Sequence, residues 1–436
     1  MNATGTAGTP ARLAVVGIGA DGWAGLGEAA RGAVLAAAEV VGSARQLALL
    51  PADVKATQRP WPSPIDALVE ELVECALAGD DDRTGAADTA LGTSEARRSV
   101  CVLASGDPML HGIGATLARR LPVDRFVVYP HPSAFALACA RLGWPAAEVA
   151  LVSTVAQPPE VVARLLQPRR RLIVYATGAG DAAAIAALLR EHGFGPSRFV
   201  VLEQLGGAEE RVIESTAAEW GEQTADPLHC VAVECRAEAD AEGSAVVRSL
   251  VPGLPDDAYE NDGQLTKRNV RAITLAALAP TAGALLWDVG AGSGSIAIEW
   301  LRAEPSARAV AIERRKERAE RARANALLLG VPQLEIVLGS APEALCELDG
   351  PDAIFIGGGL TSTGVIQRCW YSLRPGGRIV ANAVTLEGER VLAFAREHCG
   401  GELVRIEISH AEPLGTFEAW RSQLPVVQWS ARKERA

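Results

Sequence analysis

Short apolar runs alternate with amphipathic stretches along the C-terminal part of the chain. The runs lie at 284–292, 307–313, 334–340, 352–359 and 378–384, and two more follow at 402–409 and 426–430. Helical patterns lie between them at 295–303, 315–330, 342–348 and 361–373, and Gly330 closes the second of these helices. Buried strands that alternate with helices predict a doubly wound sheet of mainly parallel strands, as in a Rossmann-like α/β domain.

The N-terminal part shows the same alternation in two halves. Candidate strands of the first half lie at 12–19, 40–43, 99–107 and 125–130. Those of the second half lie at 171–178, 197–204, 210–216 and 228–236. We therefore expect a pair of α/β subdomains with a cleft between them, followed by the C-terminal doubly wound domain.

The charge of the chain changes after residue 236. Residues 237–262 carry seven acidic side chains and one basic side chain, whereas residues 263–436 carry 21 basic and 19 acidic ones. Gly, Pro and other small residues accompany the acidic cluster, which predicts an exposed linker. We therefore divide the chain into residues 1–236, an acidic linker at 237–262 and residues 263–436, and we expect a mobile polar loop at 79–98.

Composition argues against several classes of protein. The 436 residues are 49% hydrophobic and 22% charged, which is ordinary for a globular chain of two or three domains. A net charge of −11 argues against non-specific binding to nucleic acid, and no apolar run is long enough to cross a membrane. The N-terminus lacks a signal-peptide pattern, and eight dispersed cysteines favour free thiols in a reducing cytoplasm. No Cys or His spacing suits a metal ion.

A glycine-rich loop directly follows the apolar run at 284–289. The loop consists of Gly290, Ala291, Gly292, Ser293 and Gly294, and a helix is predicted from Ser295. Glycines let a ligand approach the N–H groups at a helix N-terminus. Glu313 ends the next predicted strand, where a carboxylate can accept both hydroxyls of a ribose. This GxGxG spacing favours S-adenosylmethionine (SAM) over a nicotinamide dinucleotide, whose fingerprint is GxGxxG.

Several residues near other strand ends suit the same cleft. Asp288 precedes the loop and could orient it or a ligand ammonium group, or it could be a solvated acid. Residues 340–343 fit a capping box, and backbone groups of Ser340 and Ala341 would face an adenine. Gly357–Gly359 would leave room for a bulky substrate, unless they form a plain mobile turn. Thr266 is expected to cap a helix that covers the cofactor.

Four segments of this part resemble the decarboxylating precorrin methyltransferase domain of cobalamin biosynthesis. They are residues 262–278, 285–300, 311–330 and 339–345, and the resemblance covers most of residues 262–436. It implies SAM contacts at Thr266, Gly290, Ala291, Gly292, Ser293, Gly294, Glu313 and Ala341. One position departs from the family pattern, because Asn269 stands where we expect a Glu that completes the box at the start of the helix.

The N-terminal part carries a formal dinucleotide fingerprint. Gly17, Gly19 and Gly22 follow a predicted strand, and Glu39 lies about 20 residues further on. A single match of this kind is a weak signal. It nevertheless keeps an NAD-dependent dehydrogenase open as an alternative.

Polar loops at other strand ends favour a different cofactor. Segments 17–26, 103–114, 131–145 and 202–211 resemble the tetrapyrrole methylase superfamily, in particular its precorrin-6Y branch, in which SAM binds between two α/β subdomains. The resemblance implies cofactor contacts at Ser105, Gly106, Asp107, Leu110 and Ser133. His111 and His131 lie near these loops and are candidates for substrate contacts. Residues 153–160 lack the His of the Ser-x-His-Gly pattern expected there.

Together the two resemblances imply a bifunctional enzyme with two SAM sites. The N-terminal domain would methylate C5 of a precorrin tetrapyrrole, and the C-terminal domain would methylate C15 and decarboxylate the ring C acetate. An electron-rich ring carbon is itself the nucleophile, so we assign no catalytic residue and expect no metal. A degenerate N-terminal domain that only binds or associates is an alternative, whereas the acidic charge disfavours a nucleic-acid methyltransferase. We expect the tetrapyrrole and a second copy of the chain as partners.

Overall fold

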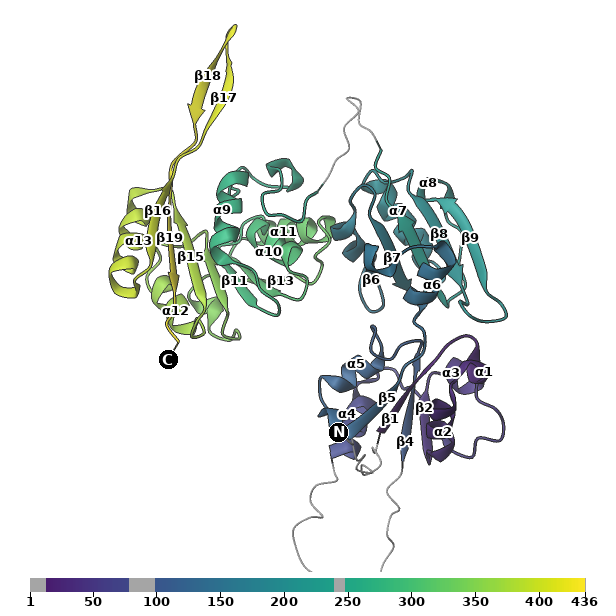
Figure 1. Ribbon diagram of the computed structural model, residues 1–436. Helices are drawn as coiled ribbons and strands as arrows, with labels where there is room; N and C mark the ends of the chain where they lie inside the picture. Colours follow the sequence, from purple (N-terminus) through teal and green to yellow (C-terminus); the bar gives the residue numbers. More distant parts are fainter. Residues whose placement is uncertain (1–12, 78–98, 239–247, 436) are drawn as a thin grey trace, which may run out of the picture. The chain divides into compact units, whose positions relative to one another are not determined.

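The computed structural model describes residues 13–77, 99–238 and 248–435 (Figure 1). The chain forms two compact units. The first comprises Met1–Val155, Arg170–Ala186 and Ser197–Glu234, and the second comprises Ala156–Arg169, Ala187–Pro196 and Cys235–Ala436. The polar loop expected at 79–98 and part of the expected linker, 239–247, lie outside the described residues.

The first unit begins with a sheet of five parallel strands in the order β3-β2-β4-β1-β5. Its strands are β1 (Leu13–Ile18), β2 (Glu39–Gly42), β3 (Thr57–Pro60), β4 (Val100–Ser105) and β5 (Phe126–Tyr129). Its helices are α1 (Gly22–Gly25), α2 (Glu28–Ala36), α3 (Ala44–Ala48), α4 (Asp66–Leu77) and α5 (Ile113–Ala118). Separate apolar clusters join α2 and α3 to one face and α4 and α5 to the other.

A second five-stranded sheet has the order β6-β7-β10-β8-β9, and only β6 and β7 pair in parallel. Its strands are β6 (Val149–Ser153), β7 (Arg171–Ala176), β8 (Arg198–Glu203), β9 (Arg211–Thr216) and β10 (His229–Glu234). Its helices are α6 (Ala134–Leu142), α7 (Asp181–Glu191) and α8 (Ala217–Trp220). The predicted pair of α/β subdomains is confirmed. Strands β3 and β6 were not predicted; the Thr57–Pro60 strand contains no apolar run.

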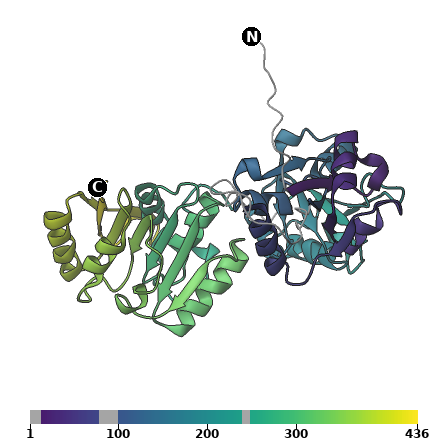
Figure 2. The same cartoon turned by 90° about the horizontal axis from the view of Figure 1, so that it is seen from below.

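A seven-stranded sheet forms the centre of the second unit, in the order β13-β12-β11-β14-β15-β19-β16. The strands are β11 (Leu285–Val289), β12 (Arg308–Glu313), β13 (Glu335–Leu338), β14 (Ala353–Ile356), β15 (Arg378–Ala383), β16 (Glu402–Ile406) and β19 (Val426–Arg432). The first five are parallel, and β19 runs antiparallel to both neighbours. The helices are α9 (Arg268–Leu278), α10 (Ser295–Ala303), α11 (Lys316–Leu328), α12 (Val365–Ser372) and α13 (Leu386–Cys399). Figure 2 shows helices on both sides of these strands, which confirms the doubly wound prediction.

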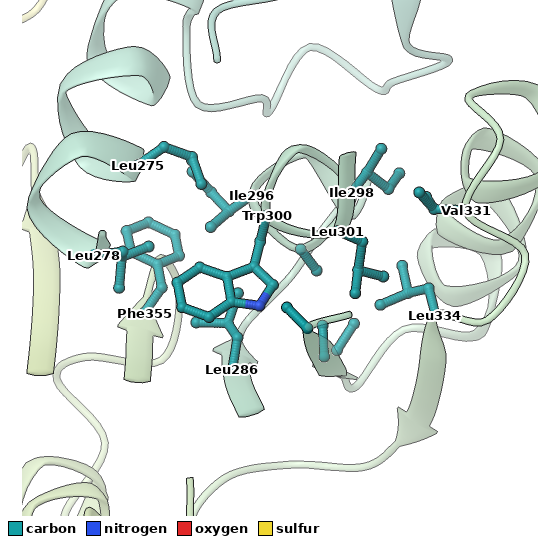
Figure 3. Packing of buried hydrophobic residues seen from close by; sticks show 14 of the residues in the cluster. Leu275, Leu278, Leu286, Ile296, Ile298, Trp300, Leu301, Val331, Leu334 and Phe355 are labelled. Atoms are coloured by element: carbon teal, nitrogen blue, oxygen red, sulfur yellow. The ribbon is translucent and has the colours of Figure 1, made fainter. Parts of the chain in front are cut away.

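Alternate residues of the central strands face two separate cores. Leu286 and Phe355 pack against Trp300 and the helices α9 and α10, and Figure 3 shows these side chains meeting around the indole. Trp287 and Ile354 face the opposite side, where α12 and α13 cover the sheet. Because both faces are covered, the strands are apolar throughout, as the continuous runs in the sequence predict.

Three local predictions are wrong. Helix α9 begins at Arg268 with Lys267 as N-cap and no capping side chain, so Thr266 is not the cap and Asn269 does not occupy the third helical position. The expected capping box at 340–343 does not form, because Pro342 precedes a single 3₁₀ turn without a side-chain cap. Leu254 and Tyr259 are buried in the core around Trp300, so this end of the expected linker is packed onto the domain rather than exposed throughout.

A two-stranded hairpin lies between β16 and β19 in the chain. Its strands are β17 (Ser409–Leu414) and β18 (Phe417–Ser422), and they pair only with each other. In Figure 1 the hairpin stands away from the sheet of its own unit. Leu414, Phe417 and Trp420 are exposed on it. Short 3₁₀ helices complete the described elements: Val123–Arg125, Ala146–Glu148, Pro159–Leu165, Asp256–Ala258 and Glu343–Leu345.

Candidate functional site

The glycine-rich loop of the second unit lies at the carboxyl edge of its sheet, between β11 and α10. The backbone N–H groups of Gly290 and Ala291 both donate to the carbonyl of Ile312 on the neighbouring strand. Gly290 has φ +74°, and a Cβ there would lie 2.5 Å from the Cα of Gly358. The loops after β11 and β14 therefore touch through bare backbone. This packing offers a structural reason for Gly358 in addition to the space for a substrate predicted above.

Glu313 ends β12 beside this loop and is buried. Its Oε2 accepts the N–H of Gly292 at 2.9 Å, and its Oε1 accepts the N–H of Arg315 at 2.9 Å. An ionised carboxylate has about four acceptor positions, so both oxygens can accept further hydrogen bonds. Glu313 thus fixes the middle of the glycine loop and can still accept the hydroxyls of a ribose.

Asp288 lies on β11, directly below the loop, and is 1% exposed. Its Oδ2 accepts the N–H of Ala297 in the first turn of α10 at 3.0 Å. Its Oδ1 is buried and has no hydrogen-bond partner among the described residues. Burial raises the pKa of Asp288 from its ordinary value of 3.8 to about 7, against the lowering effect of the Ala297 hydrogen bond, and the charge of Glu313 adds to the rise.

The raised pKa of Asp288 makes the stability of the second unit depend on pH. The folded state binds the proton more tightly than the unfolded state, so the contribution is fully present below about pH 4 and is lost as pH rises through about 7. In the wild-type protein we expect the free energy of unfolding to decline by about 1 kcal/mol per pH unit between these two pH values, and we expect Asp288→Asn to abolish this decline. Urea denaturation at a series of pH values measures this. Equal pH slopes in the two proteins would contradict the assignment.

A buried ion pair fixes the segment that precedes α9. Arg271 of α9 donates from Nε to Oε1 of Glu299 at 2.6 Å, and both side chains are buried. Glu299 also accepts the N–H groups of Gly253 and Leu254 and the hydroxyl of Tyr259. Arg271 in turn donates to the carbonyl of Thr266. The network therefore determines the position of the Thr266 backbone, although Thr266 does not cap the helix.

Two further contacts hold the predicted cofactor residues together. Asn325 of α11 is buried and donates from Nδ2 to the carbonyl of Ser293 at 3.0 Å and to that of Glu260 at 2.9 Å. The N–H of Gly339 donates to the carbonyl of Glu313 at 3.0 Å, and the half-buried Ala341 follows two residues later. The structure thus places Glu313 beside both the glycine loop and the turn that leads to Ala341.

A cavity of about 480 Å³ lies between the start of α9 and the base of the hairpin. The residues that line it are Pro255, Asp256, Asp257, Lys267, Arg268, Asn269, His410 and Gln423. Three of these follow Thr266 directly, so the cavity adjoins the segment that the Arg271–Glu299 pair fixes. No local pattern in the sequence joins residues 410 and 423 to this place. His410 and Gln423 hydrogen-bond to each other, and Val270 of α9 packs against Ile406 and Val426 at the base of the hairpin.

The first unit brings together two of the loops predicted for its cofactor. Gly106 follows β4 with φ +58°, and its N–H donates to the carbonyl of Ile18 at 3.0 Å. A Cβ at Gly106 would lie 3.2 Å from the Cα of Ser133, whose Oγ caps α6 by accepting the N–H of Ala136. Asp107 accepts the N–H of Met109, and its carbonyl accepts that of the half-buried Leu110.

Two residues that were not predicted from the sequence, Asp21 and Tyr175, contact the two candidate histidines near these loops. Nε2 of His131 lies 3.2 Å from Oδ2 of Asp21, within the loop after β1. Tyr175 of β7 accepts the N–H of Phe135, its ring centroid lies 6.0 Å from that of His111, and burial raises its pKa. Both Asp21 and Tyr175 lie at or just after a strand, but their partners are 110 and 40 residues away in the chain.

The dinucleotide alternative fails on the position of Glu39. Gly17 lies level with Ala104 near the carboxyl edge of the first sheet, whereas Glu39 starts β2 level with Val100. Four residues of strand place the two about 13 Å apart along the strands. A ribose-binding acid belongs at the carboxyl edge of the sheet. Glu39 instead starts its strand at the opposite edge, and its Oε1 lies 3.7 Å from Nη1 of Arg59.

The described residues contain neither a candidate metal centre nor a candidate membrane span. No group of three or more His, Cys, Asp or Glu residues in that part of the chain is placed to hold a metal ion. No helix among those residues combines the length and apolar character needed to cross a membrane.

Comparisons with known proteins agree on one family. A family model described as "Precorrin methyltransferase domain" matches residues 257–433, and one described as "Tetrapyrrole (Corrin/Porphyrin) Methylases" matches residues 12–220. A precorrin-6Y C(5,15)-methyltransferase [decarboxylating] from Sinorhizobium sp is 43% identical over 423 residues, which are 97% of this chain and 96% of the relative.

Two shorter relatives match part of the chain. A probable cobalt-precorrin-6B C(15)-methyltransferase (decarboxylating) from Saccharolobus solfataricus is 34% identical over 166 residues, 37% of this chain and 82% of the relative. The crystal structure of the C-terminal domain of precorrin-6Y C5,15-methyltransferase from Rhodobacter capsulatus is 49% identical. The match covers 43% of this chain and 100% of that chain, with a TM-score of 0.41.

Proposed function

Because the chain belongs to the precorrin-6Y C(5,15)-methyltransferase (decarboxylating) family, we propose that it methylates C5 and C15 of precorrin-6Y and removes the carboxyl group of the ring C acetate, which gives precorrin-8X. The observation that carries this proposal is the bare-backbone loop 290–294 beside the buried acid Glu313, in a chain related to that family over nearly its whole length. Cobalamin biosynthesis is the pathway that this reaction serves.

The residues of the second unit fit SAM. Because Gly290 and Gly358 have no side chains, only backbone lies at this end of the sheet. Glu313 retains acceptor positions for a ribose, and the unpartnered Oδ1 of Asp288 lies below the loop. We propose that Thr266, residues 290–294, Glu313 and Ala341 hold this molecule. SAM supplies an electrophilic methyl group, and the chain binds the two reactants in line and excludes water.

We assign the two steps to different domains. The Saccharolobus solfataricus relative, named for C(15) methylation and decarboxylation, matches only 37% of this chain, a share that residues 263–436 can accommodate. The domain at 263–436 would therefore methylate C15 and release CO2, and the domain at 1–236 would methylate C5, with residues 237–262 joining them. Ser105, Gly106, Asp107, Leu110 and Ser133 would hold the second SAM, and the contact between Gly106 and Ser133 supports this grouping.

Incubation of the full chain with precorrin-6Y and methyl-labelled SAM tests the proposed function. Mass analysis should find two labelled methyl groups gained and one carboxyl group lost per product molecule. Equilibrium dialysis should find two SAM molecules per chain. One bound SAM and one added methyl would instead support a degenerate N-terminal domain.

Gly106→Ala should slow the first methylation about tenfold. Gly106 has φ +58° and the added Cβ would meet Ser133, so the substitution costs about 1–2 kcal/mol at the loop that we assign to SAM. Gly143→Ala is the matched control, because Gly143 has φ +64° at the end of α6 and no atom within 4 Å of the added Cβ. Single-turnover methylation measures both, and equal slowing would contradict the cofactor role.

The cysteines and the exposed hairpin support two further proposals, about the compartment of the protein and about its self-association. None of the eight cysteines forms a disulfide bond, which supports a reducing compartment such as the cytoplasm. The exposed Leu414, Phe417 and Trp420 of the hairpin support self-association of the chain, because exposed apolar side chains favour burial.

A further inference from the structure

Arg45 lies at the carboxyl edge of the first sheet, in the helix α3 that follows β2. Its Nη2 donates to Oγ of Ser105 at 2.8 Å, although the two residues are 60 positions apart. Nε2 of Gln46 donates to the same oxygen at 3.1 Å. Arg45 therefore contacts the first residue of the loop Ser105-Gly106-Asp107, to which we assign the N-terminal cofactor.

Arg45 differs from the other arginines of the same unit in its partners. Arg141, Arg198 and Arg171 each pair with a carboxylate, those of Glu210, Glu214 and Glu234. Arg45 is half-buried, yet no described carboxylate lies within ion-pair distance of it. Burial lowers its pKa, and the more distant charge of Asp226 opposes this only in part. A partly desolvated guanidinium without a counter-ion is costly unless an anion joins it.

The hydroxyl of Ser105 completes an arrangement of donors. Its oxygen already accepts two hydrogen bonds, from Arg45 and from Gln46. A serine hydroxyl has two acceptor positions and one donor, so its own proton is left to donate elsewhere. Of the five guanidinium N–H groups, one is used by Ser105, and the others can form the paired hydrogen bonds that a carboxylate accepts.

We propose that Arg45 and the Ser105 hydroxyl bind a carboxylate of a ligand at the N-terminal methyl-transfer site. The inference rests on the proposed function, because that function supplies the ligands. The carboxylate comes either from the methionine part of SAM or from an acidic side chain of the tetrapyrrole. Asp226 does not fill this role, since it acts on Arg45 only through its more distant charge and forms no ion pair with it. Its Oδ1 accepts hydrogen bonds from Gln204 and from the N–H of Leu228.

The test compares Arg45→Gln and Arg45→Lys with the wild-type full chain. S-Adenosylhomocysteine and 5′-methylthioadenosine serve as probes in calorimetric titration, because only the former carries the amino-acid carboxylate. The titrations are repeated in the Glu313→Ala background, which isolates the N-terminal site. Steady-state methylation of precorrin-6Y gives the KM for the tetrapyrrole. Arg59→Gln, on the neighbouring strand β3 with its guanidinium paired to Glu71, is the control.

Loss of the guanidinium should weaken carboxylate binding by about 10- to 30-fold. This is the low end of the range for buried charge pairs, because Arg45 is only half-buried. Weaker binding of S-adenosylhomocysteine with unchanged 5′-methylthioadenosine would assign the methionine carboxylate. A raised KM for the tetrapyrrole with both nucleosides unchanged would assign the substrate. Arg45→Lys should recover part of either loss, and it also serves if Arg45→Gln does not fold.

The proposal is overturned if both Arg45 variants keep nucleoside affinities and KM within about twofold of the wild type. It is also overturned if Asp226→Asn reproduces the Arg45→Gln effect, since Arg45 would then act through Asp226. Failure of the wild-type chain to methylate precorrin-6Y would reject the proposed function instead, a result that the Arg45 variants do not influence.

Discussion

Glu313→Ala should weaken SAM binding at the C-terminal site by about 100-fold or more. The carboxylate holds the N–H groups of Gly292 and Arg315 and, in our proposal, the ribose hydroxyls as well. A hydrogen bond to a charged group contributes about 1.5–3 kcal/mol, so the loss of two costs about 3 kcal/mol or more. Calorimetric titration should find one tight SAM per chain in place of two.

The products of Glu313→Ala distinguish the two domains. The variant should add one methyl group to precorrin-6Y and release no CO2, because the C5 step does not use this site. Glu335→Ala on the neighbouring strand β13 is the control, since Glu335 is exposed at the start of the strand. Undiminished binding of two SAM molecules by Glu313→Ala would refute the cofactor assignment in the second unit.

Glu299→Ala should lower the free energy of unfolding of the second unit by about 3–5 kcal/mol. The substitution leaves the buried Arg271 guanidinium without its carboxylate and frees the N–H groups of Gly253 and Leu254. Hydrogen exchange of helix α10 in urea measures the change, because a chain of two units need not unfold in a single step.

Two comparisons make the Glu299 result specific. Glu407→Ala removes the carboxylate of the exposed pair with Arg405 and should change stability by less than about 1 kcal/mol. The double variant Arg271→Met/Glu299→Leu should recover only part of the lost stability. It removes the unpaired guanidinium charge, but it leaves the buried N–H groups of Gly253 and Leu254 without an acceptor. Equal effects of Glu299→Ala and Glu407→Ala would show that the buried network does not hold the segment before α9.

The sequence predicted the fold where local pattern and tertiary environment agree. Strands β11, β12, β14 and β15 are buried on both faces and read as continuous apolar runs. Helix α13 was not predicted; charged and polar residues interrupt its apolar face. The hairpin β17–β18 was missed as well. It has little apolar alternation because it has no sheet or helix to cover either face.

The candidate site was predictable only in part for a related reason. Glycine loops and strand-end acids such as Glu313 are visible because their roles depend on a few neighbouring residues. Arg45 looked like any other arginine on a short helix. A rule that weighs every charged residue just after a strand would have found it, whereas the contact of Asp21 with His131 needs knowledge of the folded chain.

The burial of Leu254 and Tyr259 determines where the chain can be divided into separate domains. These residues precede the first family-like segment at 262, yet they complete the hydrophobic interior around Trp300 and supply a partner of Glu299. A fragment that contains the second domain alone must therefore retain the stretch from Gly253 onward. The connecting peptide is thus part of the hydrophobic interior and of the hydrogen-bond network of the downstream domain.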